Sequence, residues 1–241
     1  MASRGTHVVW FGPVNGMQVK GATAADATPH FVTCTGDGSD GQPTCGARAE
    51  AWIDPGGRRL PGLCKRLKVE EQDVDRLYLG AFSAGGQCIK RIATHPEDRA
   101  KIHAILLSDA TYTTEWLDPK KGTTKPIEGF LRFALDCLSD GRLFLATASS
   151  APNKTHPSGS QTLDGLRRGV EAAAEATFED AASDPIWQGL RPPAGAWRLR
   201  NVIFADFGGA YKHGEHATAL APVLWPRAIA SAAAECAVER G

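Results

Sequence analysis

Short, almost continuous apolar runs recur along the chain, and each one ends in a polar or glycine-rich segment. They occupy the four or five residues before Ser83 and residues 7–11, 104–107, 142–147 and 200–207. An apolar run of this length without alternation is typical of a strand buried on both faces, as in a parallel sheet. The sequence therefore predicts that these runs are strands of a mostly parallel sheet.

Segments with a helical period separate these runs. Apolar residues recur at helical spacing in residues 127–138 and 160–176, and further helical patterns follow Ser83 and begin at Ala217. Strands that alternate with helices indicate an α/β fold. Because 241 residues suffice for one sizeable α/β core but not for two, we expect a single domain over residues 1–241.

Two segments interrupt this alternation. Residues 21–62 are rich in Gly, Pro, Thr and Asp and hold weak strand patterns at residues 30–34 and 49–54, so we expect an insertion or an elaborated sheet edge. Residues 111–126 show neither a helical nor a strand period and contain Trp116. They follow a predicted strand end, and we expect them to form a lid or a pocket wall, with Trp116 against the substrate.

The chemistry-bearing stretch is the sequence Ala81-Phe-Ser83-Ala-Gly85, in which a predicted strand runs directly into a helical pattern. A strand that turns at once into a helix leaves room only for small side chains two residues either side of the apex. The apex residue is then held in a strained conformation with its hydroxyl projecting above the sheet. The alternative is a glycine-rich loop that carries an ordinary surface serine.

Other polar residues that are candidates for a functional site also follow predicted strands. Asp109 lies after the strand at residues 104–107, and His213 and His216 follow the last strand in a glycine-rich loop. The carboxyl ends of parallel strands meet at one edge of the sheet, where ligands bind. Asp109 is equally suited to capping a turn. The hydroxyls of Ser149 and Ser150 end the fourth run, and we interpret them as closing the strand rather than orienting the acid.

The corner at Ser83 and the last strand with its histidine loop resemble the α/β-hydrolase family, although Ala81 stands where the common motif has its first glycine. The resemblance implies a three-layer sandwich with a mostly parallel central sheet. It implies Ser83 as nucleophile, Asp109 as acid and His213 or His216 as base, in the family's chain order. The acid of most members follows the strand at residues 142–147, where this sequence has no carboxylate.

The resemblance also assigns the oxyanion hole, whereas the ranking of the two histidines rests on the residues of their loop. Its two amides would come from Ala84 and from the loop after the first strand, through Val14 or Gly12. We favour His213 as the base because glycines flank its loop, whereas His216 stands at the predicted start of a helix, where it would cap that helix or line the pocket. A metal site formed by the two histidines matches no zinc pattern and is disfavoured.

These residues predict a serine hydrolase of carboxylic esters that forms an acyl-enzyme on Ser83 without a cofactor. An acyltransferase with the same residues and an inactive α/β-hydrolase-like binding protein stay open as alternatives. A nucleotide-binding protein is disfavoured because no Gly-x-Gly-x-x-Gly or Gly-Lys-Ser/Thr pattern occurs.

Charge and composition restrict the partners. The chain has 27 basic and 27 acidic residues, which gives no electrostatic footprint for nucleic acid or an anionic membrane. We expect a small-molecule or polymer ester as substrate, and the oligomeric state is not predicted. No apolar run approaches the roughly 20 residues of a membrane span, and no signal peptide is recognised. A soluble, cytoplasmic protein is expected, with export by another route left open.

The six cysteines contain no Cys-x-x-Cys pair, so neither a zinc ribbon nor a redox motif is indicated. Reduced thiols are expected by default. Cys34, Cys45 and Cys64 share one loop-rich region, and a disulfide among them is compatible with an oxidising compartment.

Overall fold

The strands form one sheet in which five neighbouring pairs run parallel. A computed structural model describes residues 5–12, 27–33, 44–113, 127–150 and 157–238. Within these residues the sheet has eight strands in the order β2-β1-β3-β4-β5-β8-β7-β6, and the antiparallel pairs are β6 with β7 and β7 with β8. The strands are β1 (Gly5–Gly12), β2 (Ala27–Thr33), β3 (Val74–Phe82), β4 (Ile102–Ser108), β5 (Leu143–Ala148), β6 (Glu179–Asp180), β7 (Gly195–Leu199) and β8 (Val202–Asp206).

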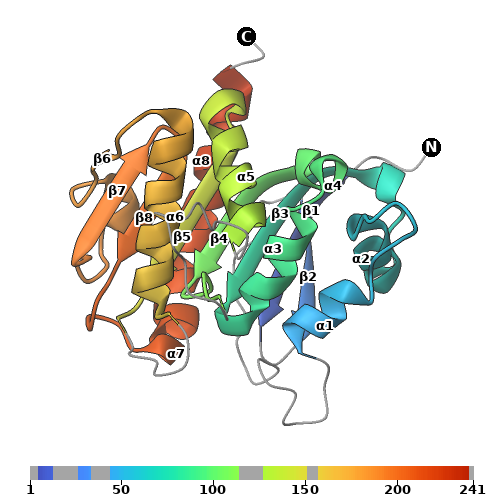
Figure 1. The fold of residues 1–241 in the computed structure, drawn as a ribbon, viewed down its shortest axis with the longest axis horizontal. Coiled ribbons are helices and arrows are strands. Elements are labelled where there is room, and N and C mark those ends of the chain that lie inside the picture. The colour runs from blue at the N-terminus through green and yellow to red at the C-terminus, as the bar shows by residue number, and fades with distance from the viewer. Residues whose placement is uncertain (1–4, 13–26, 34–43, 114–126, 151–156, 239–241) are drawn as a thin grey trace.

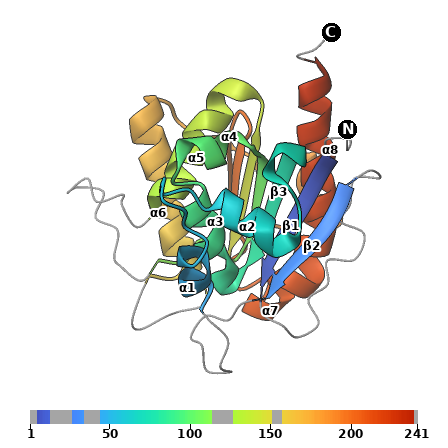
Figure 2. The ribbon, with the colours of Figure 1, turned by 90° about the vertical axis from the view of Figure 1, so that its right-hand side faces the viewer.

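Helices cover both faces of this sheet and make three layers. Figures 1 and 2 show α3, α5 and α6 on one face and α8 on the other. The α-helices are α1 (Cys45–Glu50), α2 (Leu60–Leu67), α3 (Gly86–Ile92), α4 (Pro96–Ala100), α5 (Glu128–Asp140), α6 (Gly159–Ala174), α7 (His213–Glu215) and α8 (Ala221–Val238). The predicted fold, an α/β sandwich with a mostly parallel central sheet, is confirmed.

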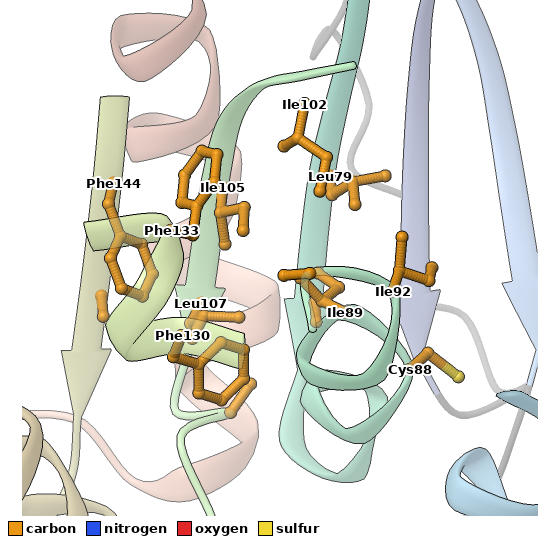
Figure 3. Close-up of a cluster of buried hydrophobic side chains, with 14 of the residues drawn as sticks. Leu79, Cys88, Ile89, Ile92, Ile102, Ile105, Leu107, Phe130, Phe133 and Phe144 are labelled. Carbon is orange, nitrogen blue, oxygen red and sulfur yellow. The ribbon is translucent and has the colours of Figure 1, made fainter. Parts of the chain in front are cut away.

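Burial on both faces explains the uninterrupted apolar runs. In β3, Leu79 faces the layer of α3 and α5, where Ile89 and Phe133 pack, as Figure 3 shows. Its neighbour Tyr78 points the other way and packs in the cluster that contains Trp225 of α8. Each fully buried side chain of this size stabilises the fold by about 1.5–3 kcal/mol. A central strand therefore needs apolar residues at consecutive positions.

The segment at residues 21–62 differs from the expectation. The weak pattern at residues 30–34 corresponds to β2, which pairs parallel with β1 at the sheet edge. The strand predicted at residues 49–54 is wrong, because residues 45–50 form α1. Thr44 caps this helix by accepting the Ala47 amide, and a helix of six residues is too short to show a period. Residues 13–26, 34–43 and 114–126, with most of the expected lid, lie outside the described residues.

The four cysteine side chains that the structure describes are in two states. Cys45 is disulfide-bonded, whereas Cys64, Cys88 and Cys137 carry buried free thiols. The expectation of reduced thiols is therefore wrong for Cys45 and agrees with the structure at Cys64, while Cys34 lies outside the described residues. Burial raises the pKa of the Cys64 and Cys88 thiols to about 12. These two thiols stay protonated and unreactive near neutral pH.

Two further features bear on membranes and metals. Within the part of the chain that the structure describes, every helix is too short or too polar to cross a bilayer. Among those same residues, no three His, Cys, Asp or Glu side chains gather where they would hold a metal ion.

Candidate active site

Ser83 stands at the corner where β3 turns into α3. The backbone at Ser83 is left-handed, with φ of 54°, and a single 3-10 turn, Ser83–Gly85, joins the strand to the helix. A non-glycine residue in this conformation costs about 1–2 kcal/mol. A Cβ at Gly85 would lie 2.4 Å from the carbonyl oxygen of Phe11, and Ala81 is fully buried opposite Phe11. Both small positions are therefore explained by close packing against β1.

Three side chains from separate strand ends meet at this corner. Nε2 of His213 lies 2.9 Å from Oγ of Ser83, and Nδ1 of the same ring lies 2.6 Å from Oδ2 of Asp109. Ser83 follows β3, Asp109 follows β4, and His213 begins α7 after β8. In Figure 1, α7 lies below the sheet, beyond the ends of these strands. The arrangement brings together three of the four predicted catalytic residues.

The chain of contacts defines what the imidazole can do. The Asp109 carboxylate is fully buried and accepts a hydrogen bond from the N–H at Nδ1, which leaves a lone pair on Nε2 facing the hydroxyl of Ser83. Burial by itself raises the pKa of Asp109, but hydrogen bonds from His213 and from Ser149 outweigh it, so the pKa lies below its ordinary value. Asp109 is therefore ionised at neutral pH. The geometry suits transfer of the serine proton to the imidazole.

His216 is directed elsewhere. Its side chain is fully buried, Nδ1 lies 3.3 Å from Oγ1 of Thr147, and its backbone carbonyl accepts a hydrogen bond from Ser108. Its Nε2 has no hydrogen-bond partner among the described residues. Burial lowers the pKa of His216, so the ring is neutral at pH 7. The structure brings His213, not His216, to Ser83.

Solved structures share this architecture. A crystal structure described as LpqC, a poly(3-hydroxybutyrate) depolymerase from Bordetella parapertussis, matches with a TM-score of 0.50 and 17% identity, over 97% of this chain and 84% of that one. This chain has the α/β-hydrolase fold. At this identity the likeness shows the fold alone.

Other comparisons add little to this. A glucuronoyl esterase from Solibacter usitatus aligns over 97% of this chain and 74% of its own, with a TM-score of 0.37 and 12% identity, which is too weak to carry an argument. No protein-family model and no curated protein matches the chain.

The carboxylate that contacts His213 follows a different strand from the one that carries the acid in most α/β-hydrolases. The position after β5 is occupied by Ser149, and the carboxylate comes from Asp109 after the neighbouring strand β4. The backbone at Asp109 is also in the left-handed conformation, with φ of 46°. The adjacent ends of β4 and β5 let a side chain from either strand reach the imidazole.

Two aromatic residues around His213 were not predicted as site residues. The Tyr112 hydroxyl lies 3.3 Å from Nδ1 of His213, and the Phe82 ring packs against the imidazole with 4.6 Å between ring centroids. Burial, and then the charge of Asp109, raises the pKa of Tyr112, so its hydroxyl stays protonated. The sequence signal that could have identified them is their position, because Phe82 directly precedes Ser83 and Tyr112 lies shortly after Asp109.

The predicted oxyanion and substrate residues are only partly described. Ala84 lies directly after Ser83 in the 3-10 turn, and Gly12 is the last residue of β1, the strand next to β3. Val14 and Trp116 fall outside the described residues. The assignment of these four residues stays a prediction.

Proposed function

We propose that this protein is a serine hydrolase that cleaves carboxylic esters through an acyl-enzyme on Ser83. The observation that supports this most directly is the continuous chain from Oγ of Ser83 through His213 to the buried carboxylate of Asp109. A serine hydroxyl is a weak nucleophile unless an adjacent base removes its proton. Here the base lies within hydrogen-bond reach and has its own orienting carboxylate.

The first half of the reaction acylates the serine. Oγ of Ser83 attacks the ester carbonyl carbon while its proton passes to Nε2 of His213. The negative charge that develops on the carbonyl oxygen is stabilised by amides, which we assign to Ala84 and to Gly12 or Val14. The tetrahedral intermediate then expels the alcohol, which takes the proton from Nε2. Asp109 stabilises the imidazolium without being protonated.

The second half releases the acid. Water gives a proton to Nε2 of His213 and attacks the acyl carbon, and the returning proton restores the Ser83 hydroxyl as the carboxylic acid leaves. Every step uses protein groups and water. An alcohol or amine in place of water would give acyl transfer, the alternative reaction of the same residues.

The substrate is proposed only as a carboxylic ester, small or polymeric. The structural neighbour described as a poly(3-hydroxybutyrate) depolymerase makes a polyester one sensible member of a test panel. Trp116 and the segment around it are proposed to contact the substrate.

The test is hydrolysis of activated esters of graded acyl length by the wild-type protein and by Ser83→Ala. We expect the variant to lose at least about 10⁴-fold in kcat/KM while keeping its melting temperature. Ser150→Ala is the matched control, because this serine is exposed at the same end of β5. Turnover retained by Ser83→Ala would refute the proposal. Adding an alcohol and analysing the products separates hydrolysis from acyl transfer.

A further inference from the structure

The Asp109 carboxylate is held by more than the imidazole. Ser149, the first residue after β5, donates its hydroxyl to Oδ2 of Asp109 at 2.5 Å and its backbone amide to Oδ1 at 3.0 Å. Ser149 is 2% exposed, so water does not compete for these bonds. One residue thus contacts both carboxylate oxygens, which fixes the plane of the carboxylate as well as its position.

The Ser149 hydroxyl and the His213 imidazole contact the same oxygen of Asp109. Oδ2 of Asp109 accepts from the Ser149 hydroxyl and from Nδ1 of His213, at 2.5 and 2.6 Å. Hydrogen bonds to an ionised acceptor are shorter and about twice as strong as those between neutral groups. If the Ser149 hydroxyl were absent, Oδ2 would lose this short hydrogen bond and the carboxylate could rotate away from the ring.

Ser149 is itself held in place by the next helix. Its carbonyl accepts the amide of Ser160 at 3.3 Å, in the first turn of α6. This helix begins at Gly159 after Ser158, whose side chain caps it by accepting the amide of Gln161. The partial positive charge of a helix N-terminus favours a nearby carboxylate. A Cβ at Gly159 would lie 2.5 Å from Oδ1 of Asp109, so the carboxylate fits closely against the start of α6.

We propose that Ser149 is a positioning residue for the hydrolysis proposed above, which acts by holding the Asp109 carboxylate in the orientation that His213 requires. This inference rests on the proposed function. It also corrects the interpretation of Ser149 as a residue that merely closes its strand. Ser149 contacts neither the substrate nor Ser83 in this account, and its whole effect passes through Asp109.

The first test compares Ser149→Ala with Ser150→Ala on the ester that the wild-type protein hydrolyses best. We expect kcat to fall about 10- to 100-fold in Ser149→Ala with KM little changed, because a small misplacement of a catalytic group slows the chemical step. Ser150→Ala should match the wild type. Ser149→Cys nearly keeps the side-chain volume but replaces the hydroxyl by a weak donor, so its kcat should also lie below that of Ser150→Ala. This variant replaces Ser149→Ala in the test if Ser149→Ala folds poorly.

The second test is whether the effect depends on Asp109. In an Asp109→Asn background, adding Ser149→Ala should lower kcat less than about two-fold, because the group through which Ser149 acts is already lost. A purely structural role would give the same relative loss in both backgrounds. In proton NMR, the signal of the proton between His213 and Asp109 should shift or broaden in Ser149→Ala and stay unchanged in Ser150→Ala.

The two proposals fail in different ways. If Ser83→Ala stays active, the proposed function is wrong, and the role of Ser149 in that reaction falls with it. If Ser83→Ala is inactive while Ser149→Ala has the wild-type kcat and NMR signal, only the role of Ser149 is wrong. An equal loss from Ser149→Ala in both backgrounds would likewise overturn positioning through Asp109.

Discussion

The two turns that follow β8 carry one histidine each, and their surroundings differ sharply. The side chain of His213, in α7, is 38% exposed and lies between Ser83 and the Asp109 carboxylate. His216, three residues later at the start of a π-helical turn (His216–Leu220), is fully buried against Thr147 and two aromatic rings. Only the first can exchange protons with a hydroxyl and still reach solvent or substrate.

The comparison shows that a histidine near the site can act as a base only when its two ring nitrogens have suitable partners. Both histidines lie near Asp109, but only His213 has a carboxylate on one nitrogen and a hydroxyl on the other. Burial holds the His216 ring neutral, and its backbone carbonyl ties the turn to Ser108 at the end of β4. We therefore interpret His216 as a structural residue that supports the turn on which His213 stands.

The largest expected effect comes from removing the imidazole of His213, and removing the imidazole of His216 is the matched comparison. His213→Ala should lower kcat/KM for esters by about 10⁴-fold or more, because the hydroxyl of Ser83 loses its base. His216→Gln should stay within about ten-fold of the wild type, since its contacts are structural. Steady-state kinetics of the two folded variants measure this difference. Equal losses of kcat/KM in both variants would contradict the distinction between the two turns.

The second-largest expected effect on activity is that of Asp109→Asn. The amide carries no charge and can present an N–H to Nδ1, which favours the wrong tautomer of His213, so kcat should fall about 10⁴-fold. The melting temperature is measured alongside, because the amide also disturbs the hydrogen bonds with Ser149. Activity within about ten-fold of the wild type would exclude Asp109 as the acid.

These same residues show which parts of the site can be predicted from the sequence. Ser83, Asp109 and both histidines were identified because each follows a predicted strand, and parallel strands end at one edge. The choice between His213 and His216 rested on glycines alone, because the direction of a side chain in an irregular turn depends on the tertiary path of the loop. The described geometry agrees with the preference for His213, whose role stays a proposal.

Contacts between distant segments were harder to predict. Ser149 was interpreted as a strand-closing hydroxyl because its partner, Asp109, lies 40 residues away and no periodic pattern links them. The short antiparallel strands β6 and β7 were missed, since strands of two and five residues show little alternation. The five buried strands were predicted because burial on both faces makes their composition distinctive.

A smaller effect is expected at the start of α6. In Gly159→Ala the new methyl group would lie 2.5 Å from Oδ1 of Asp109, so the carboxylate or the helix must move. We expect kcat to fall about 100-fold, as for a misplacement near 1 Å. Gly209→Ala is the matched control, because a Cβ there meets nothing within 4 Å. A Gly159→Ala variant with wild-type kinetics would show that the site tolerates this shift.

The smallest effect concerns stability and pH. The pKa of His216 is lowered in the folded state from its ordinary value of 6.5, so the unfolded chain binds more protons once the pH falls below about 6.5. The free energy of unfolding should therefore decrease as the pH falls through this range, and increase again as it rises. His216 contributes at most about 1.4 kcal/mol per pH unit.

His216→Gln should make this dependence shallower, which melting temperatures between about pH 7 and pH 5 would reveal. His7, His30 and His103 also have lowered pKa values and act in the same direction, so part of the slope should stay. An unchanged slope in the variant would show that His216 is not held neutral by the fold.

The central claim is that the hydroxyl of Ser83 is activated by His213. The most direct measurement is labelling with a fluorophosphonate, followed by mass spectrometry of the digested protein. We predict a single adduct on the peptide that contains Ser83, absent in Ser83→Ala and strongly slowed in His213→Ala but not in His216→Gln. An unlabelled wild-type protein, an adduct on another residue, or labelling that does not depend on His213 would contradict the account.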